Sequence, residues 1–353
     1  MTVGGDYWRN NLKARNRILA WIILVTAALP LDREATAQEY AIKFATLAPE
    51  GSTWMNIMRE YDAAVREESK GRLRFKIYGS GSQGADDVVL RKIRVGQLHS
   101  AGFTGVGLGE IAPKVRILEA PFLFKDYGEV DHIYGTFEEE FREAFKEGDY
   151  VLLGWAEVGF VHVFANKPVR TLAELRNVRM WMWEGDLMAE ATFKALNVDP
   201  IPLSIIDVLM SLQTGLIDGV YAPPYAAITL QWFTRVKYMM DVPIADASGA
   251  VVISKKMFYS LPADLQEILL RNGKKYTRML TEKSRQENSS SIKTLERNGI
   301  ELIEISSAKT LETYIDAGKK ARQSLVGKLY DQDFLDRVEN ILAEYRVRHD
   351  SSK

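Results

Sequence analysis

The chain has 353 residues with 46 basic and 47 acidic side chains, and its formal net charge is −1. This balance provides no basic surface of the kind that nucleic acids require, so we expect no nucleic-acid partner. The absence of cysteine excludes disulfides, a lipid-modified N-terminal cysteine, thiol catalysis and thiolate metal sites. A hydrophobic content of 46% is typical of an ordered globular protein.

The first 37 residues have the pattern of a secretory signal peptide. Basic residues between positions 13 and 17 precede an apolar run over 18–31, and Ala35-Thr36-Ala37 forms a small-x-small cleavage pattern. A membrane anchor is the alternative, but the run is short for a membrane span and Pro30 interrupts its end. We therefore expect cleavage after Ala37 and a mature, soluble periplasmic protein.

Strands alternate with helices in the first half of the mature chain. Period-two alternation and short apolar runs predict strands, and capped amphipathic stretches predict helices. The alternation of the two types indicates an α/β fold. We expect strands over 40–47, 72–78, 98–108, 150–156 and 159–166, and helices over 52–69, 86–95 and 127–146.

The second half begins with an alternating run over Val178–Trp183. This run places Val178, Met180 and Met182 on one face and the two tryptophans, with Arg179, on the other. A helix follows over 187–196. Further strands are expected over 238–243, 250–253 and 301–305, and further helices over 254–259, 262–290 and 307–353.

Three segments in this region carry a resemblance to a known family. They are ELRNVRMW at 174–181, FKALNVDPIP at 193–202 and LQTGLIDG at 212–219, with supporting stretches at 47–54, 81–97 and 118–124. In this order they resemble the signature of the periplasmic solute receptors of TRAP transporters, the DctP-type family. The resemblance covers nearly the whole mature chain.

The resemblance implies an α/β fold of two lobes with a ligand cleft between them. Lobe I would comprise 38–162 plus about 249–290, and lobe II would comprise 163–248 plus about 291–353. Segments near 159–166 and 246–251 would cross between the lobes. Such receptors use no cofactor and perform no catalysis. They close on a small-molecule ligand and dock on a membrane permease of two parts.

The chain departs from the family at the positions that hold an anionic ligand. The arginine that clamps a substrate carboxylate in the family falls on Trp181, a second arginine falls on Val161, and an asparagine falls on Ala222. An anion in such a cleft would lose hydration without compensation, whereas apolar surface gains about 25 cal/mol per Å² buried. We therefore expect an apolar or aromatic ligand, with a hydrophobic acid included. The departures resemble the subgroup that pairs with a periplasmic tetratricopeptide-repeat protein.

The ligand contacts that we expect follow from this alignment. An alternative register, produced by a local bulge, would make Arg179 the carboxylate clamp of an ordinary receptor. The candidate contacts are Trp181, Val161, Ala222, Trp183, Tyr221, Trp54, Phe122, Gln83 and, in the alternative, Arg179.

No motif in the chain indicates catalysis. The four histidines lack zinc-ligand spacing, and no G-x-S-x-G elbow is present. We interpret Glu184 and Asp186 as part of a solvated turn. In the alternative, these two carboxylates form a pair at the edge of the cleft and face a cationic group. Two other functions stay open: an enzyme that uses carboxylates such as Glu157 or Asp186, and an exported envelope adaptor without a small ligand.

Overall fold

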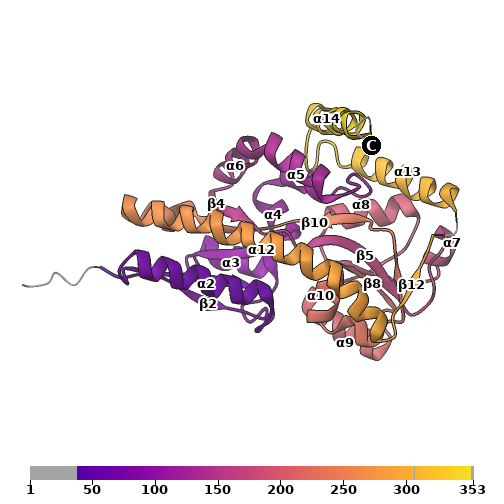
Figure 1. Cartoon of the computed structure of the whole chain (residues 1–353), viewed down its shortest axis with the longest axis horizontal. Coiled ribbons are helices and arrows are strands. Elements are labelled where there is room, and N and C mark those ends of the chain that lie inside the picture. The colour runs from indigo at the N-terminus through magenta and orange to yellow at the C-terminus, as the bar shows by residue number, and fades with distance from the viewer. Residues whose placement is uncertain (1–37, 306, 351–353) are drawn as a thin grey trace, which may run out of the picture. The chain divides into compact units, whose positions relative to one another are not determined.

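Two larger β-sheets organise the part of the chain that the computed structural model describes, residues 38–305 and 307–350 (Figure 1). The expected signal peptide, residues 1–37, lies outside the described residues. The elements from Tyr40 onwards form one compact unit. No helix among the described residues is long and apolar enough to cross a membrane.

The first sheet has five strands in the order β2-β1-β3-β11-β4. Strand β1 pairs in parallel with β2 and β3, and the late strand β11 returns antiparallel between β3 and β4. We call this sheet and its covering helices lobe I. The strand bounds are β1 Tyr40–Thr46, β2 Leu73–Tyr78, β3 Ser100–Thr104, β4 Tyr150–Trp155 and β11 Gly249–Ser254.

The helices of lobe I begin where the sequence provides caps. Ser52 accepts from the backbone N–H of Met55 and starts α2, and Asp126 accepts from that of Glu129 and starts α5. The strand expected over 98–108 is shorter, because residues from Gly105 form a helix instead. The bounds are α2 Thr53–Glu68, α3 Asp86–Arg94, α4 Gly105–Ile111, η1 Pro113–Glu119, α5 Tyr127–Thr136, α6 Glu138–Glu147 and α11 Lys255–Phe258.

The second sheet, which with its helices we call lobe II, has the order β10-β5-β9-β12, and β8 pairs with β5. A separate parallel pair joins β6 to β7. The bounds are β5 Gly159–Ala165, β6 Trp181–Trp183, β7 Ile201–Leu203, β8 Gly219–Ala222, β9 Tyr238–Met240, β10 Ala245–Ala247 and β12 Glu301–Ile303. The helices are α7 Leu172–Leu175, α8 Leu187–Leu196, η2 Ile205–Asp207, α9 Val208–Thr214, α10 Pro224–Thr229, η3 Trp232–Arg235 and α13 Ala308–Ser324.

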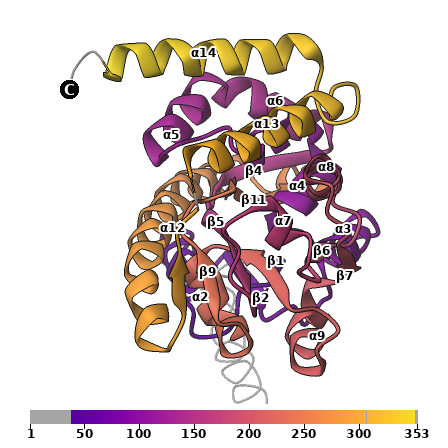
Figure 2. The same ribbon diagram turned by 90° about the vertical axis from the view of Figure 1, so that its right-hand side faces the viewer.

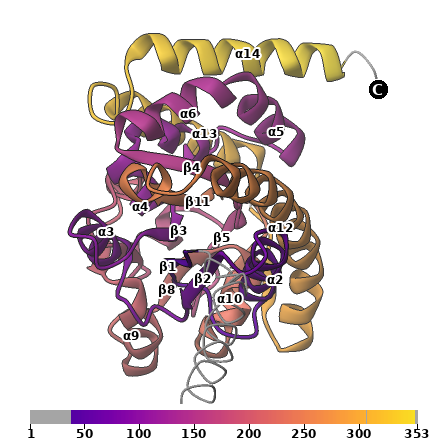
Figure 3. The same ribbon diagram turned by 90° about the vertical axis from the view of Figure 1, so that its left-hand side faces the viewer.

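Two neighbouring backbone connections and one long helix are among the segments that join the lobes. The chain passes from β4 to β5 and from β10 to β11, and these connections pair through hydrogen bonds from Ala156 N to Gly249 O (2.7 Å) and from Val158 N to Ala247 O (2.9 Å). Helix α12, Ala263–Arg297, packs along α2 and β4 of lobe I and then against α10 of lobe II (Figures 1 and 3).

The last helix, α14 (Gln332–Asp350), lies on lobe I rather than on lobe II, where we expected residues 291–353. Figure 2 shows α14 above α5 and α6. The ring of Phe334 packs edge-on against Phe137 at 5.1 Å, and Arg346 pairs with Glu129 at 2.7 Å. Residues 325–331 separate α14 from α13, so the single helix expected over 307–353 is in fact two helices.

Candidate functional site

A cavity of about 270 Å³ lies between the two lobes. This volume is slightly below the usual range for small-molecule sites, about 300–1,000 Å³. Its wall is predominantly apolar. The larger apolar side chains in that wall include Trp54, Phe103, Phe122, Val161, Val163, Met180, Trp181, Trp183, Met188, Phe193, Leu196, Trp232 and Met240.

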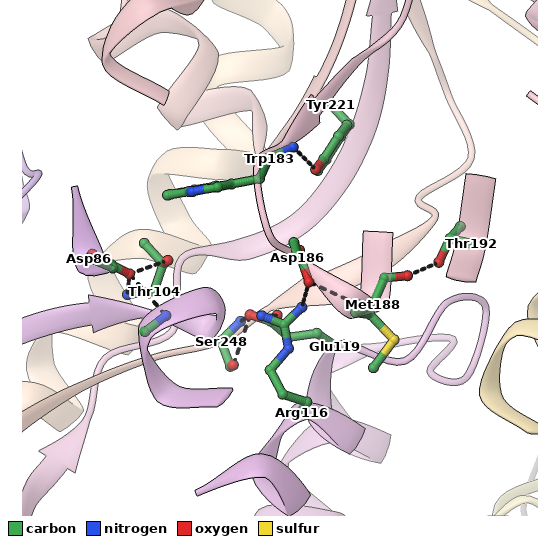
Figure 4. A network of polar contacts seen from close by, with 11 residues as sticks. Asp86, Thr104, Arg116, Glu119, Trp183, Asp186, Met188, Thr192, Tyr221 and Ser248 are labelled. Carbon is green, nitrogen blue, oxygen red and sulfur yellow. Dashed lines mark hydrogen bonds and ion pairs between the residues drawn. The ribbon is translucent and has the colours of Figure 1, made fainter. Parts of the chain in front are cut away.

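The two tryptophans of β6 have different positions in the wall. Trp181 is 1% exposed, stacks on Tyr221 at 4.8 Å and meets the edge of Trp232 at 5.3 Å. Its indole Nε1 donates to the carbonyl of Leu203 (2.9 Å). Trp183 is only half-buried, and Figure 4 shows its ring extending away from Tyr221. Trp181 is thus a core residue that forms the wall from behind, and Trp183 is the more accessible of the two.

Val161 and Ala222 also line the cavity, but they belong to opposite faces of their sheet. In the antiparallel register, Ala222 of β8 faces His162, whereas Val161 faces Ala245 of β10. Paired residues point to the same face, and successive residues alternate. Ala222 accordingly shares a core cluster with Trp181. The three positions that we expected to correspond to the family's anion-binding groups therefore do not form one continuous wall.

Lobe I contributes two of the expected aromatic residues. Trp54, in the first turn of α2, stacks on Phe44 at 6.5 Å, and its ring occupies the space where a Cβ on Gly102 would lie. Phe122 has a φ of 54°, and its ring lies 5.8 Å from that of Tyr314. Both side chains line the cavity.

The cavity lining continues into lobe II between its sheet and the helices α8 and α13. Phe193 and Leu196 line it from α8, Met240 lines it from β9, and Tyr314 lines it from α13. The Tyr314 hydroxyl is buried without a hydrogen-bond partner. This part of the wall is mainly apolar, and its hydroxyl groups are those of Tyr314 and of Thr192, which donates to the carbonyl of Met188 (2.7 Å).

Two of the expected contacts do not line the cavity. Arg179 donates from Nε and Nη2 to Asp218 Oδ2 (3.1 and 3.0 Å), and its side chain is 56% exposed. Gln83 accepts from the Nζ of Lys92 (3.1 Å). Because Arg179 is engaged with Asp218 outside the lining, the register with Arg179 as a carboxylate clamp is not favoured.

Arg116 is the only basic residue among the described residues that line the cavity, and sequence reasoning missed it. It is 3% exposed; its Nη1 lies 3.1 Å from Glu119 Oε2 and its Nη2 lies 2.5 Å from Asp186 Oδ1 (Figure 4). The signal in the sequence was a cation inside the apolar run VRIL at 115–118. The solvated turn that we expected at 184–186 holds for the exposed Glu184 and is wrong for Asp186.

Burial and charge pairing have opposite effects on the pKa of Arg116 and on the pKa of Glu119. Burial raises the pKa of Glu119, and the nearby Arg116 guanidinium partly offsets that rise. Burial alone would lower the pKa of Arg116, but Asp186 and Glu119 hold it above its usual range. Burial also raises the pKa of Asp86 to about 6, although this carboxyl group accepts from Thr104. No group of residues in the described ranges has the composition of a metal site.

Several curated proteins that are similar to this chain are bacterial solute-binding proteins. The chain is 24% identical to the 2,3-diketo-L-gulonate-binding periplasmic protein YiaO of Escherichia coli, over 69% of this chain and 75% of that protein. It is 25% identical to the C4-dicarboxylate-binding periplasmic protein DctP of Vibrio cholerae, over 68% of this chain and 70% of that protein.

Solved structures match the fold over most of the chain. DctP7 of Bordetella pertussis, an extracytoplasmic solute receptor binding pyroglutamic acid, matches with a TM-score of 0.79 and 18% identity, over 86% of this chain and 99% of that one. A TRAP periplasmic solute binding protein from Desulfovibrio salexigens with bound orotic acid matches with a TM-score of 0.80 and 17% identity, over 87% and 99%.

The family model for bacterial extracellular solute-binding proteins, family 7, matches residues 44–327. The described part of the chain thus has the two-lobe α/β fold of TRAP binding proteins, and its relatives are receptors rather than enzymes. The chain belongs to the DctP family, the bacterial extracellular solute-binding proteins of family 7.

Proposed function

We propose that this chain is a TRAP-type receptor whose ligand is largely hydrophobic or aromatic. The observation that carries the proposal is the apolar wall, which continues from the space between the lobes into lobe II beside Phe193, Leu196 and Met240. Apolar ligand surface gains about 25 cal/mol for each Å² removed from water. A ligand that fills this cavity would therefore obtain most of its affinity from contacts with apolar side chains.

The charges of the cavity support the same proposal. A small dicarboxylate or sugar acid needs cationic groups to compensate for the hydration that it loses on burial. Arg116 is the one basic residue in the described lining, and both Glu119 and Asp186 contact its guanidinium. In the alignment that the resemblance implies, Trp181 stands at the family's clamping arginine and Val161 at its second cleft arginine. Relatives that bind 2,3-diketo-L-gulonate or C4-dicarboxylates are thus guides to the fold and the transport role, and not to this ligand.

The route of the ligand follows from the family. We propose that the mature receptor works in the periplasm and delivers the ligand to the membrane subunits of a TRAP permease. We also propose a periplasmic tetratricopeptide-repeat protein as a partner, because the departures at Trp181, Val161 and Ala222 resemble the subgroup of receptors that pairs with one.

Identification of co-purified small molecules tests the proposal directly. Protein purified from the periplasm would be extracted with organic solvent and the extract analysed by mass spectrometry. The stripped protein would then be titrated with the uncharged probe N-phenyl-1-naphthylamine, followed by fluorescence. We expect a hydrophobic molecule at near-stoichiometric amount, and competition between that molecule and the probe.

Three outcomes would contradict the proposal. A sugar acid or short dicarboxylate in the extract, displaced by pyroglutamate or glucuronate but not by the probe, would indicate an ordinary carboxylate receptor. An empty extract together with no thermal stabilisation by any probe would indicate an adaptor without a small ligand. Chemical turnover of the extracted molecule would indicate an enzyme.

A further inference from the structure

The Arg116 network joins the two lobes across the cavity. Arg116 and Glu119 lie on η1 of lobe I, whereas Asp186 is the N-cap residue of α8 in lobe II. The contact of Arg116 Nη2 with Asp186 Oδ1, at 2.5 Å, is therefore a contact between the lobes. Figure 4 shows the guanidinium between the two carboxylates, at the cavity.

Each carboxylate is held by a second interaction that fixes its position. Asp186 Oδ1 accepts from the backbone N–H of Met188 (2.9 Å), so the residue that caps α8 also faces Arg116. Glu119 Oε1 accepts from the backbone N–H and the hydroxyl of Ser248, at 2.9 Å each, between β10 and β11. Gly105 permits this arrangement, because a Cβ there would lie 1.9 Å from Glu119 Oε2.

The charge of this network determines which polar group a ligand can bring. One cation faces two carboxylates, and Arg116 is the only basic residue in the described lining. A ligand carboxylate would be a third negative group around a single guanidinium, and it would lose its hydration as well. A ligand without a carboxylate has no such penalty, and its hydroxyl or amide hydrogens can donate to Glu119 or Asp186.

We propose that Asp186 supplies, from within the chain, the carboxylate that pairs with Arg116 between the lobes, so that the cavity selects hydrophobic ligands that have no carboxylate. This inference rests on the proposed function and narrows it to uncharged amphiphiles, the class that includes alcohols, amides and esters with an apolar body. Asp186 is thereby a residue that determines specificity.

A matched pair of probes tests the inference. 1-Octanol and octanoate share a chain length and differ in the polar end, and their affinities for the stripped full-length protein can be measured by calorimetry at neutral pH. We expect the wild-type protein to bind octanol at least tenfold more tightly than octanoate. In Asp186→Asn, the affinity for octanoate should rise at least tenfold relative to the affinity for octanol.

The variants are chosen so that loss of folding cannot explain the result. Asparagine is as good an N-cap as aspartate, so Asp186→Asn keeps the start of α8. Glu119→Gln removes the second carboxylate from the same guanidinium and should shift the preference in the same direction. Asp333→Asn is the control, because Asp333 pairs with Arg337 on α14 with 82% of its side chain exposed.

The outcomes separate this inference from the proposed function. Equal affinities of the wild-type protein for octanol and octanoate, or an unchanged preference in Asp186→Asn, would overturn the role of Asp186 and leave the proposed hydrophobic ligand standing. A carboxylic acid as the co-purified hydrophobic ligand would do the same. Binding of neither probe, with no hydrophobic molecule in the extract, would overturn the hydrophobic ligand and this inference with it.

Discussion

Replacement of each β6 tryptophan by alanine should distinguish their roles. We expect Trp181→Ala to lower the stability of the protein and Trp183→Ala to lower its affinity for the ligand. Trp181 is 1% exposed and is packed between Tyr221 and Trp232, and its Nε1 bonds to Leu203. Truncation of a buried Trp costs about 3–5 kcal/mol of stability, and loss of the hydrogen bond adds about 1 kcal/mol. The midpoint of thermal unfolding should therefore fall by on the order of 10 °C.

Trp183→Ala is the matched control, because it removes the same side chain from the same strand at a more exposed position. Since Trp183 is half-buried, its loss should cost less than about 2 kcal/mol of stability. Its ring lines the cavity, and stacking adds on the order of 1 kcal/mol to the apolar contact. We expect the affinity for the co-purified ligand to fall at least tenfold, which corresponds to about 1.4 kcal/mol.

Calorimetric unfolding and ligand titration of both variants measure the two effects. An unfolding midpoint of Trp181→Ala equal to that of the wild-type protein would refute its role as a core residue. Wild-type affinity in Trp183→Ala would refute its contact with the ligand. In either case the positions assigned to the two tryptophans in the cavity wall would be wrong.

Three further predictions concern Asp86, Gly105 and the N-terminus of the exported protein. Because burial raises the pKa of Asp86 to about 6 from an ordinary 3.8, its stabilising contribution is complete below about pH 3.8 and is lost as the pH rises through 6. The loss is about 3 kcal/mol, and comparison of wild-type and Asp86→Asn unfolding at pH 4 and pH 7 should reveal it; a difference independent of pH would contradict it. Gly105→Ala forces Glu119 to move and should lower the unfolding midpoint, whereas Gly135→Ala in α5, where no atom lies within 4 Å of the added Cβ, should not; equal effects would contradict the packing argument. N-terminal sequencing of the exported protein should begin near Gln38, and an uncleaved N-terminus in the membrane fraction would contradict the signal peptide.

The alternation of β6 could be predicted from the sequence because it depends on neighbouring residues. Val178 and Met180 pack in one core cluster of lobe II, with Met182 against it, while Trp181 belongs to another and Trp183 packs against that one. Which residues share a face of a strand depends on backbone geometry alone, so contacts with distant residues do not change it. The helix over 187–196 was equally local, and it has the predicted bounds.

The Arg116 network could not be predicted, because its members come together only through the fold. Arg116 and Asp186 are 70 positions apart in the sequence. A Glu-Gly-Asp turn is polar, and such turns are usually solvated, which is why we interpreted Asp186 as a surface residue. The placement of α14 on lobe I likewise depends on distant pairs such as Phe334 with Phe137, which local patterns do not specify.

The same network bears on how the receptor releases its ligand. The cavity lies between the lobes, so we expect ligand exchange to proceed by their separation, which would break the contact of Arg116 with Asp186. A buried arginine left alone would cost several kcal/mol. Arg116, however, retains its ion pair with Glu119, which lies on the same helix, η1. Asp186 retains its hydrogen bond from the Met188 N–H at the start of α8, where a negative charge is favoured. Both partners therefore retain compensation in the open state, and the interaction between the lobes can form and break without leaving an unpaired buried charge.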